Sequence, residues 1–516
     1  MTIYHSTFAG IDVPAVSITD YIIPALLARA DLPVMIDGPT GRALTGAMLL
    51  DLIRRLAGGL TARALGPGRV IAIMAPNIPE YAAVFHGVAY AGGTITTVNP
   101  LYTADELRFQ LNDARADILI TVPAFLDTAQ AAIVGTAVTG IFVLGDADGA
   151  LPFSDLLGVP QMAQTPVDLH EHTLVLPYSS GTTGLPKGVM LSHANLVANV
   201  AQLKAVFPID PGEVSVVVLP FFHIYGMNAI MNPFLVQQAV QITLPRFDLE
   251  LFLRLIQTHK IAKIFVVPPV VLALAKHPLI DQFDLSALRV VFSGAAPLGA
   301  ELSNACAARL QCDVIQGYGM TELSPVSHAT QVGHNLPGSS GRALPLTQCR
   351  IIDTETGLDV AAGDVGELWV SGPQAMQGYL NNPAATAATL DADGWLRTGD
   401  IARIDADGYL FIVDRLKELI KYKGFQVPPA ELEALLQTHP AVADVAVVGR
   451  ADDDAGEIPV AFVVTKPGVV QDAADLQAFV AGHVASYKQI RQVRFVDAIP
   501  KSASGKILRR VLKDQL

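Results

Sequence analysis

The stretch YSSGTTGLPKGVMLSHANL, Tyr178–Leu196, decides how this sequence folds and what it binds. A strand-like run, TLVLPY, leads into it, a second apolar run, GVML, follows Lys187, and Ser192 then opens a helical pattern. Glycines let backbone N–H groups approach a polyanion, while the hydroxyls and Lys187 add donors and a positive charge. The stretch therefore predicts a phosphate-binding loop that joins two strands.

A Walker A loop does not fit this stretch. That loop needs G-x-x-x-x-G-K-[ST], with the lysine directly after a glycine and a helix that starts at once. Here Lys187 follows Pro186, and the helix begins only after Ser192, a natural N-cap. A plain glycine-rich surface hairpin is the other alternative, and the many hydroxyls beside one lysine argue against it.

Length and composition limit the classes of protein to which this chain can belong. A chain of 516 residues is too long for one ordinary core, so several domains or subdomains are expected. A hydrophobic content of 51% with 16% charged residues is typical of a well-packed enzyme. The formal charge of −13 argues against nucleic-acid binding. Cys306, Cys312 and Cys349 form no CxxC pair, which argues against a disulfide framework and a thiolate zinc site.

The termini and the apolar runs bear on location. The first residues, MTIYHSTFAG, lack a basic region followed by an apolar one, so no signal peptide is expected. No apolar run is long enough to cross a bilayer. We therefore expect a cytoplasmic monomer or homodimer whose partners are small molecules, with no membrane span and no nucleic acid.

Strand-like and helix-like patterns alternate along the first two thirds of the chain. The run VIAIMA (70–75) predicts a buried strand, and Thr103 with Glu106 predicts the capping box of a helix. Repeated strand–helix–strand units favour parallel sheets covered by helices. From about Arg350, short strands and DG, TG and SG turns predict an antiparallel barrel or sheet.

These patterns predict an α/β protein with two domains. The large N-terminal domain covers 1–415: two parallel-sheet α/β subdomains to about residue 345, and a small β-barrel-like part over about 346–415. The C-terminal domain, 416–516, is small and α+β, and the joint between the domains lies near Lys417.

Six motifs, in one order along nearly the whole chain, resemble those of a known superfamily. They are YSSGTTGLPKG, LPFFHIYGM, QGYGMTELSP, GWLRTGD, VDRLKELIKYKGFQ and PKSASGKILRR. Together they are similar to the signatures of the adenylate-forming (AMP-binding) superfamily, closest to its acyl-CoA synthetase and 4-coumarate–CoA ligase branch. The resemblance implies the adenylate-forming fold, with a mobile C-terminal lid, and the use of ATP, Mg²⁺ and CoA.

The implied reaction is ATP-dependent ligation of an apolar organic acid, either aromatic (as in hydroxycinnamic acids) or of medium chain length, to CoA. The carboxylate attacks the α-phosphorus of ATP, pyrophosphate leaves, and the acyl group of the acyl-AMP then passes to CoA. Because two anions must meet, cations are needed at the site. Lys506 and the loop Lys421–Gln426 both lie beyond Lys417, so a rotation at this hinge would exchange them between the two half-reactions.

The resemblance also implies roles for single residues. Thr183, His223, Glu322 and Lys506 are the expected catalytic residues. Glu322 follows a glycine turn at a strand end and is the expected ligand of Mg²⁺, a cation that prefers oxygen. The expected ATP or AMP contacts are Ser179, Ser180, Gly181, Thr182, Thr183, Lys187, Gln316, Gly317, Tyr318, Thr321, Asp400, Arg415 and Lys506.

The resemblance also implies which residues contact the acid and CoA. His223 is expected to gate the acyl pocket rather than act as a nucleophile. The expected acyl-substrate residues are His223, Tyr225, Ala229, Phe265, Phe292, Gly294, Ala295, Gly317, Pro325, Val326, Lys417 and Lys421. Most are apolar, which favours an aromatic or medium-chain acid. Arg246, Lys423 and Gly424 are expected to contact CoA.

Other functions stay open at this point. An adenylation enzyme that loads an acid onto a carrier protein is the main alternative. Amino-acid adenylation domains usually place an aspartate at the aromatic motif, and FFHIYGM contains no acid. A nucleotide sensor without activity would show broken motifs, whereas these are intact. Release of AMP and pyrophosphate, rather than ADP and phosphate, separates the ligase from a P-loop enzyme.

Overall fold

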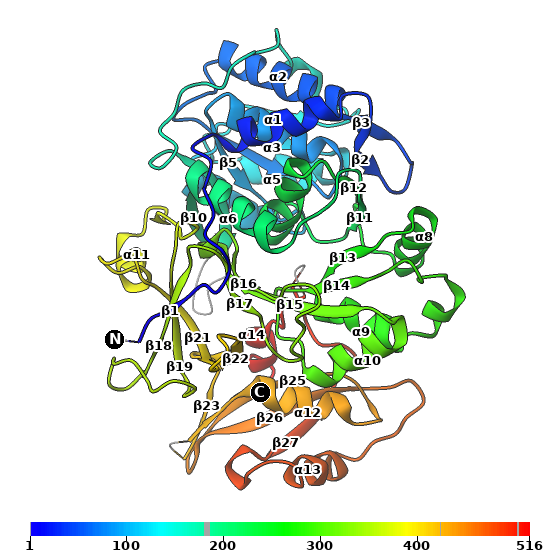
Figure 1. The fold of residues 1–516 in the computed structure, drawn as a ribbon, viewed down its shortest axis with the longest axis vertical. Helices are drawn as coiled ribbons and strands as arrows, with labels where there is room; N and C mark the ends of the chain where they lie inside the picture. Colours follow the sequence, from blue (N-terminus) through cyan, green and yellow to red (C-terminus); the bar gives the residue numbers. More distant parts are fainter. Residues whose placement is uncertain (1, 180–185, 424, 503–504) are drawn as a thin grey trace.

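Four β-sheets and the helices that cover them make up the structure. The structure, a computed structural model, describes residues 2–179, 186–423, 425–502 and 505–516. In Figure 1 the first α/β subdomain lies at the top, the second in the middle, an antiparallel sheet at the left and the C-terminal domain at the bottom. The predicted α/β architecture is confirmed; the exact domain boundaries stay a prediction.

The first subdomain is built on an eight-stranded sheet. Its strands run in the order β20 (Gly378–Tyr379), β10 (Lys187–Ser192), β9 (Thr173–Ser179), β5 (Thr94–Thr97), β4 (Val70–Met74), β6 (Ile118–Thr121), β7 (Ile141–Val143) and β8 (Leu151–Pro152). Six of them, from β9 to β8, pair in parallel, as helical crossovers require. The helices here are α2 (Gly46–Ala62), α3 (Glu80–Tyr90), α4 (Ala104–Ala114), η1 (Pro123–Phe125), α5 (Leu126–Ile133), η2 (Phe153–Leu156) and α6 (His193–Val206).

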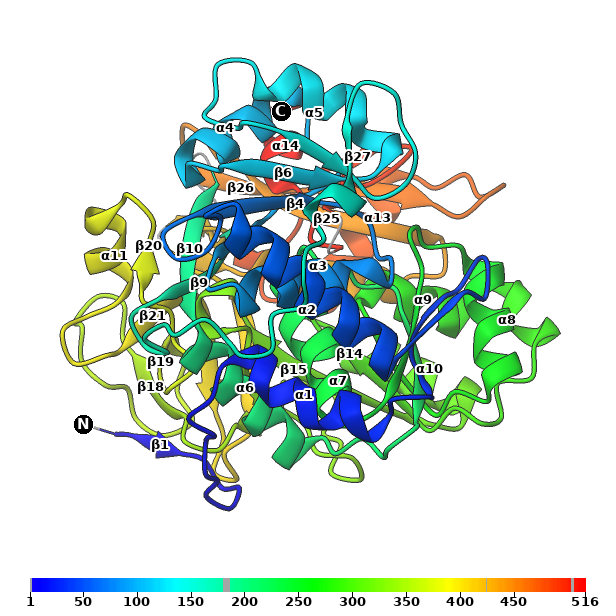
Figure 2. The ribbon, with the colours of Figure 1, turned by 90° about the horizontal axis from the view of Figure 1, so that it is seen from above.

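Helices cover both faces of this sheet. Figure 2 shows α4 and α5 on one side of β4 and β6, with α2 and α3 on the other. The strands are therefore buried along nearly their whole length, as in β4 and β6, instead of alternating between buried and exposed residues. The predicted capping box of α4 is present: Thr103 accepts from the N–H of Glu106, whose carboxylate accepts from the N–H of Thr103.

The two apolar runs on either side of the predicted phosphate loop form strands β9 and β10. Strands β9 and β10 pair antiparallel, with Ser179 opposite Lys187. Ser192 caps α6 through its Oγ, which accepts from the N–H of Asn195. The prediction of a loop between two strands, rather than a loop that opens a helix, is confirmed.

The second subdomain has a nine-stranded sheet. Its order is β17 (Arg342–Ala343), β16 (Val326–Ala329), β15 (Asp313–Gly319), β14 (Val290–Ser293), β13 (Lys263–Val266), β11 (Val214–Val217), β12 (Val240–Thr243), β2 (Pro33–Asp37) and β3 (Ala43–Thr45). Its helices are α1 (Ile18–Ala28), the π-helix η3 (Tyr225–Met231), α7 (Asn232–Val236), α8 (Leu249–His259), α9 (Pro268–Lys276), η4 (Pro278–Gln282), α10 (Ala300–Leu310) and η5 (Thr321–Leu323). The N-terminal hairpin β2–β3 thus joins strands that come about two hundred residues later.

A five-stranded antiparallel sheet completes the large domain. Its order is β1 (Tyr4–His5), β18 (Gln348–Ile352), β19 (Gly366–Ser371), β21 (Leu396–Ile404) and β22 (Leu410–Arg415), with α11 (Pro383–Thr389) beside it. It is an open sheet, since the path of paired strands has two ends, β1 and β22. The last strand, β22, ends at Arg415, next to the predicted hinge.

The C-terminal domain has its own sheet and its own apolar cores on both faces of it. Its order is β24 (Phe425–Val427), β23 (Ile420–Tyr422), β26 (Gly456–Thr465) and β25 (Val442–Asp452), with β27 (Gln492–Phe495) paired to β26. The helices are α12 (Pro429–Thr438), α13 (Ala473–Ala481), η6 (Ser486–Lys488) and α14 (Arg509–Lys513). The segment Lys421–Gln426 was expected to be a loop. Its two ends instead belong to the paired strands β23 and β24, in which Lys421 lies opposite Gln426.

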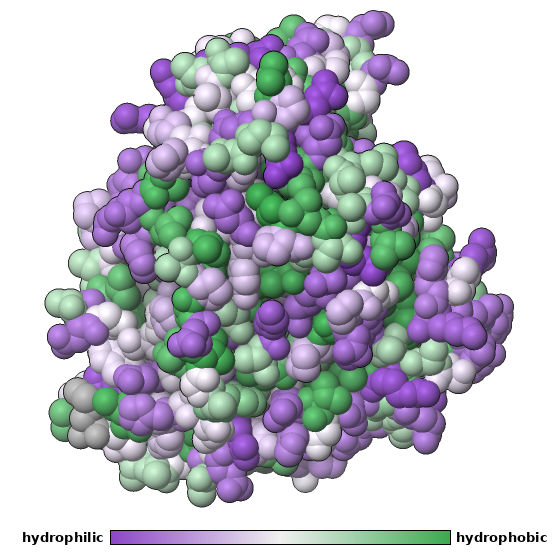
Figure 3. Space-filling model, turned by 45° about the horizontal axis from the view of Figure 1, so that its top comes forward, coloured by the Kyte–Doolittle hydropathy of each residue, from purple (hydrophilic) through white to green (hydrophobic). Residues whose placement is uncertain are grey.

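Hydrophilic and hydrophobic residues are interspersed over the face of the molecule in Figure 3. Among the described residues, no helix is both long and apolar enough to span a membrane.

One close approach in the first subdomain can be tested. A Cβ atom on Gly59 of α2 would lie 1.7 Å from the carbonyl oxygen of Leu156. Both partners are backbone, so Gly59→Ala should cost about 3 kcal/mol and lower the thermal unfolding midpoint by on the order of 5 °C. The matched control is Gly10→Ala, which would meet nothing within 4 Å. Equal midpoints for both variants would contradict the packing described.

Candidate active site

The Lys506 loop packs against the large domain. Within the loop, the N–H of Ser502 donates to the carbonyl of Lys506 (2.8 Å), and the N–H of Lys506 donates to Ser502 Oγ (3.2 Å). Gly505 has a positive φ of 78°, and a Cβ atom there would lie 3.2 Å from Val267 Cγ2, just after β13. This close contact brings Lys506 into the junction between the two domains.

The ammonium group of Lys506 lies in a charged environment. Burial lowers the pKa of Lys506 first, and repulsion from Arg415 lowers it further. The carboxylates of Asp400, Glu322 and Glu418 act in the opposite direction and favour the charged form. The loop therefore brings one cation near two carboxylates of the large domain, Asp400 on β21 and Glu322 on η5.

Asp400 and Arg415 form a pair that the antiparallel sheet sets up directly. They lie opposite one another on β21 and β22, and Arg415 Nε is 3.2 Å from Asp400 Oδ1. The hydroxyl of Tyr318 donates to Asp400 Oδ2 at 2.6 Å. Asp400 is only 4% exposed, so burial raises its pKa while Arg415 opposes the rise. The result is a fixed carboxylate that can accept from a further hydroxyl.

Glu322 keeps one carboxylate oxygen free. Ser179 Oγ (3.1 Å) and Tyr379 Oη (2.8 Å) both donate to Oε1, whereas Oε2 accepts from no residue within the described part of the chain. Lys187 Nζ lies 4.3 Å from the centre of the Tyr379 ring. Glu322 is 5% exposed, and Tyr379 thus connects it to the lysine of the predicted phosphate loop.

Tyr379 is not among the residues predicted from the sequence. It lies on β20, which pairs with β10 directly behind the phosphate loop. The motif-poor run MQGYL contains no local pattern that marks it. Only the pairing of strands almost two hundred residues apart reveals that its hydroxyl reaches Glu322.

His223 is held neutral and fixed in orientation. Burial, and then the positive charge of Lys506, lower the pKa of His223 to about 3. Its Nδ1 atom accepts from the N–H of Tyr225 at 3.2 Å, so a neutral ring carries its proton on Nε2. Such a ring suits packing and hydrogen bonding near a substrate, as expected for a gate.

A small cavity of about 20 Å³ has Tyr225, two residues after His223, in its wall. It is lined by Leu203, Phe207, Ile209, Tyr225, Ala229, Pro233, Gln237, Phe265, Phe292 and Val326. Five of these were predicted as acyl-substrate residues: Tyr225, Ala229, Phe265, Phe292 and Val326. The other five were missed, because they come from α6, the segment after it, and α7, where no motif marks them.

Two predicted glycines lie behind the aromatic walls. A Cβ atom on Gly294 would come within 2.8 Å of the Tyr225 ring, and one on Gly317 within 2.7 Å of the Phe292 ring. Glycine at both positions therefore makes room for these rings. Ala295 and Pro325, also predicted, are not among the residues that line the cavity.

Packed aromatic rings narrow the cavity. The ring centres of Phe207 and Phe265 are 5.4 Å apart, and those of Phe265 and Phe292 are 5.6 Å apart. Offset and edge-on contacts of this kind are favourable and leave little space between the rings. The wall at Val326 is held by Asn199 of α6, which donates to the carbonyl of Val326 at 2.7 Å.

The side-chain amide of Gln316, an expected ATP or AMP contact, forms hydrogen bonds within the protein. Both ends of its side-chain amide bond to the backbone of Leu298, at 3.1 Å each. Its side chain therefore fixes the segment after β14, which carries Gly294 and Ala295. Thr321 begins the short helix η5, directly before Glu322.

Several predicted residues are not brought to this region. Lys417, Lys421 and Lys423 are exposed, the last two at the outer hairpin of the C-terminal domain. Arg246 is exposed as well and lines a surface hollow with Arg254, Asp248 and Glu250. Ser180, Gly181, Thr182, Thr183 and Gly424 lie outside the described residues.

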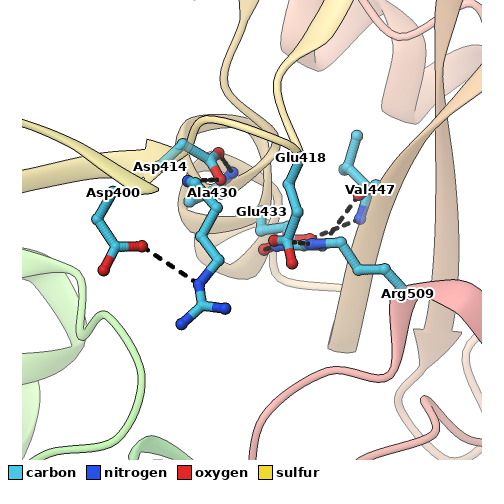
Figure 4. A network of polar contacts seen from close by, with 8 residues as sticks. Asp400, Asp414, Glu418, Ala430, Glu433, Val447 and Arg509 are labelled. Carbon is cyan, nitrogen blue, oxygen red and sulfur yellow. Dashed lines mark hydrogen bonds and ion pairs between the residues drawn. The ribbon is translucent and has the colours of Figure 1, made fainter. Parts of the chain in front are cut away.

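The segments around the hinge are bound to one another (Figure 4). Arg509 of α14 pairs with Glu418, just past Lys417, and with Glu433 of α12, and it donates to the carbonyl of Val447. Asp414, just before the hinge, accepts from the N–H of Ala430 at the start of α12 (2.8 Å). The Lys506 loop is thus tied, three residues away, to the part of the C-terminal domain nearest the hinge.

Two models of known protein families match most of this chain. The family model described as AMP-binding enzyme matches residues 26–380, and that of the AMP-binding enzyme C-terminal domain matches residues 431–506. The chain belongs to the AMP-binding enzyme family.

Curated relatives match along the whole chain. The chain is 42% identical to 4-coumarate–CoA ligase 5 of Oryza sativa subsp. japonica and 41% identical to 4-coumarate–CoA ligase of Pinus taeda. Each alignment covers all of this chain, and 97% and 98% of the respective relative. The predicted class of activity, ATP-dependent ligation of a carboxylic acid to CoA through an acyl-adenylate, is confirmed.

Solved structures confirm the adenylate-forming fold. The anthranilate CoA ligase AuaEII with anthranoyl-AMP has a TM-score of 0.89 at 27% identity, covering 98% of both chains. ATP-bound MatB from Rhodopseudomonas palustris has a TM-score of 0.88, and apo MatB from the same organism 0.77, both at 29% identity. Both alignments cover 97% of this chain and 99% of MatB, so the arrangement here is closer to the ATP-bound one.

The neutral state of His223 yields a prediction about pH. Its folded pKa, about 3, lies below the ordinary value of 6.5, so the unfolded chain takes up this proton first as pH falls. The resulting contribution to stability is complete above pH 6.5 and is lost as pH falls toward 3. Histidine side-chain NMR should show no titration of His223 between pH 5 and 8, with His223→Asn used to assign its signal. A titration midpoint above pH 5 would contradict the burial described.

Proposed function

We propose that this chain activates an apolar carboxylic acid, aromatic or of medium chain length, as its acyl-AMP and passes the acyl group to CoA. Two positions of the C-terminal domain serve the two half-reactions. The observation that carries this proposal is the position of Lys506 near Asp400, Arg415 and Glu322 at the domain junction. In this arrangement the chain is set up for the first half-reaction.

Adenylation needs a positive charge where two anions meet. Lys506 is proposed to contact the substrate carboxylate and the α-phosphate, and so to lower the repulsion between them in the transition state. A lysine can do this only when charged, and the nearby carboxylates of Asp400 and Glu322 favour that form. His223, neutral and fixed, is proposed to close the mouth of the acyl cavity.

Contacts to the ribose and the phosphates of the nucleotide are also proposed. Asp400 is proposed to accept from the ribose hydroxyls, with Arg415 and Tyr318 holding its carboxylate in place. Ser179 and Lys187 stand at the two ends of the phosphate loop, opposite one another on β9 and β10. The proposed contacts at Ser180, Gly181, Thr182, Thr183 and Gly424 remain sequence-based.

The donors present fit a magnesium ion bound together with ATP. The described part of the chain contains no cluster of three or more metal-binding side chains. Mg²⁺ usually takes one or two carboxylates and completes its shell with phosphate oxygens and water. Glu322, with Oε2 left free, supplies one such ligand. Mg²⁺ at this residue would neutralise charge on the departing pyrophosphate.

Thioester formation requires another position of the C-terminal domain. Lys421 and Lys423 are exposed at the outer hairpin here, so they can meet the acyl-AMP and CoA only after this domain rotates about Lys417. Arg246 is proposed to contact the CoA phosphates from the surface hollow that it lines. A cytoplasmic location and a monomeric or homodimeric state complete the proposal.

The nature of the acid is proposed from the cavity and from the relatives. Eight of the ten lining residues are apolar, and three of them are phenylalanines. The relatives cited above are named for 4-coumarate, an aromatic acid. An aromatic acid of hydroxycinnamate type therefore suits this site better than a polar acid.

The role of Lys506 can be tested by separating the half-reactions. Lys506→Ala should slow acid-dependent exchange of pyrophosphate into ATP on the order of 100–1,000-fold, because one positioned charge is lost. Thioester formation from synthetic acyl-AMP should stay within a few-fold of wild type. Lys513→Ala, at an exposed lysine of α14, is the control. Equal loss in both half-reactions would refute the assignment.

The support of Glu322 by Tyr379 gives a second test. Tyr379→Phe removes the hydrogen bond to Oε1 and keeps the ring beneath Lys187. Because hydrogen bonds to charged groups are strong, the Mg²⁺ concentration for half-maximal exchange should rise about tenfold. Tyr409→Phe serves as the control, since that hydroxyl donates to the carbonyl of His334 instead. An unchanged Mg²⁺ requirement would argue against Glu322 as a metal ligand.

A further inference from the structure

The acyl cavity contains two polar atoms without a partner. Gln237 Nε2 and Tyr225 Oη are buried and form no hydrogen bond with any residue that the structure describes. Both side chains line the cavity, each is 7% exposed, and the remaining walls are apolar. Buried polar atoms in native proteins are nearly always paired, so two of them in one apolar cavity indicate a ligand that pairs them.

The orientation of the Gln237 amide follows from its neighbour. The backbone N–H of Ile209 donates to Gln237 Oε1 at 3.0 Å, and a backbone N–H can only donate. The oxygen of the amide is therefore used, and the unpaired end is the N–H₂ group. The cavity thus presents a hydrogen-bond donor at Gln237, which calls for an acceptor on the ligand.

Gln237 also lies at the inner end of the cavity. One face of the continuous helical segment η3–α7 lines it with residues four apart: Tyr225, Ala229, Pro233 and Gln237. His223 precedes this segment and lies near the charge of Lys506, so the segment runs inward from the reacting end. At 1.5 Å per residue, the distance from Tyr225 to Gln237 is at most about 18 Å.

We infer that this cavity selects carboxylic acids that carry an oxygen at the end remote from the carboxylate, and that Gln237 recognises this oxygen. The oxygen accepts from Gln237 Nε2 at the inner end of the cavity. The inference rests on the proposed function, because it assumes that the acid enters with its carboxylate toward Lys506.

The test compares matched acids in the wild type and in Gln237→Met, which is similar in length and has no N–H. The pairs are cinnamic with 4-hydroxycinnamic acid and octanoic with 8-hydroxyoctanoic acid, which carry the remote oxygen on an aromatic ring and on an alkyl chain. In wild type, kcat/KM for CoA thioester formation should favour the oxygenated acid about tenfold in at least one pair. In Gln237→Met that preference should fall to within about twofold.

Controls separate recognition from damage to the fold. Gln237→Met also removes the acceptor for Ile209, and the matched variant is Gln257→Met on exposed α8, where Oε1 accepts from the N–H of Asp284 (2.7 Å). Gln257→Met should keep the wild-type preference. If Gln237→Met does not fold, wild type is compared on 4-hydroxycinnamic and 4-methylcinnamic acid, which are similar in size; equal kcat/KM for the two acids would overturn the inference.

The outcomes distinguish this inference from the proposed function. Equal kcat/KM for both members of each pair in wild type overturns the inference, as does an equal loss for both members in Gln237→Met. Either result leaves the ligase assignment intact, because thioester is still formed. Failure of every acid to exchange pyrophosphate into ATP would instead overturn the proposed function itself.

Discussion

The charge of one half-buried lysine is the interaction on which the site depends. Lys506 comes from a loop of the C-terminal domain, yet three of the four charges that act on it, Asp400, Arg415 and Glu322, belong to the large domain. Burial and Arg415 lower the pKa of Lys506, and the carboxylates of the large domain oppose this only while the domains stay in this arrangement. The site is therefore complete in one position of the C-terminal domain, and the whole chain is more similar to ATP-bound MatB than to apo MatB.

The large domain prepares its half of the site with neutral supports. Tyr318 holds Asp400, Tyr379 and Ser179 hold Glu322, and the Gln316 amide holds the segment after β14. Each support fixes an acidic or backbone group before any substrate is present. Because these hydrogen bonds already exist, substrate binding does not have to order these groups. Such preorganised groups are how an enzyme stabilises charge in the transition state. The same logic applies to the neutral ring of His223.

The network around Arg509 explains how the loop and the hinge can act together. Arg509 binds Glu418 next to the hinge and Glu433 on α12, and it lies three residues after Lys506. A rotation about Lys417 would therefore carry the Lys506 loop and α12 as one body. Asp414 is the contact that spans the hinge, through the N–H of Ala430. Burial raises the pKa of Asp414 to about 7, so this contact contains a carboxyl group whose charge changes near neutral pH.

By itself, the sequence determined the family, the reaction class and the local elements: the strand–loop–strand around Lys187, the cap at Ser192 and the capping box at Thr103. These depend on residues close together along the chain, so a pattern reveals them. It predicted five of the ten residues that line the cavity, and it missed Tyr379 and Gln237. Only the tertiary structure decided that β2 joins the second sheet, that Tyr379 reaches Glu322 and that Gln237 lines the cavity. The reason is physical: such contacts arise where segments far apart in sequence pack together, and no short-range pattern encodes that packing.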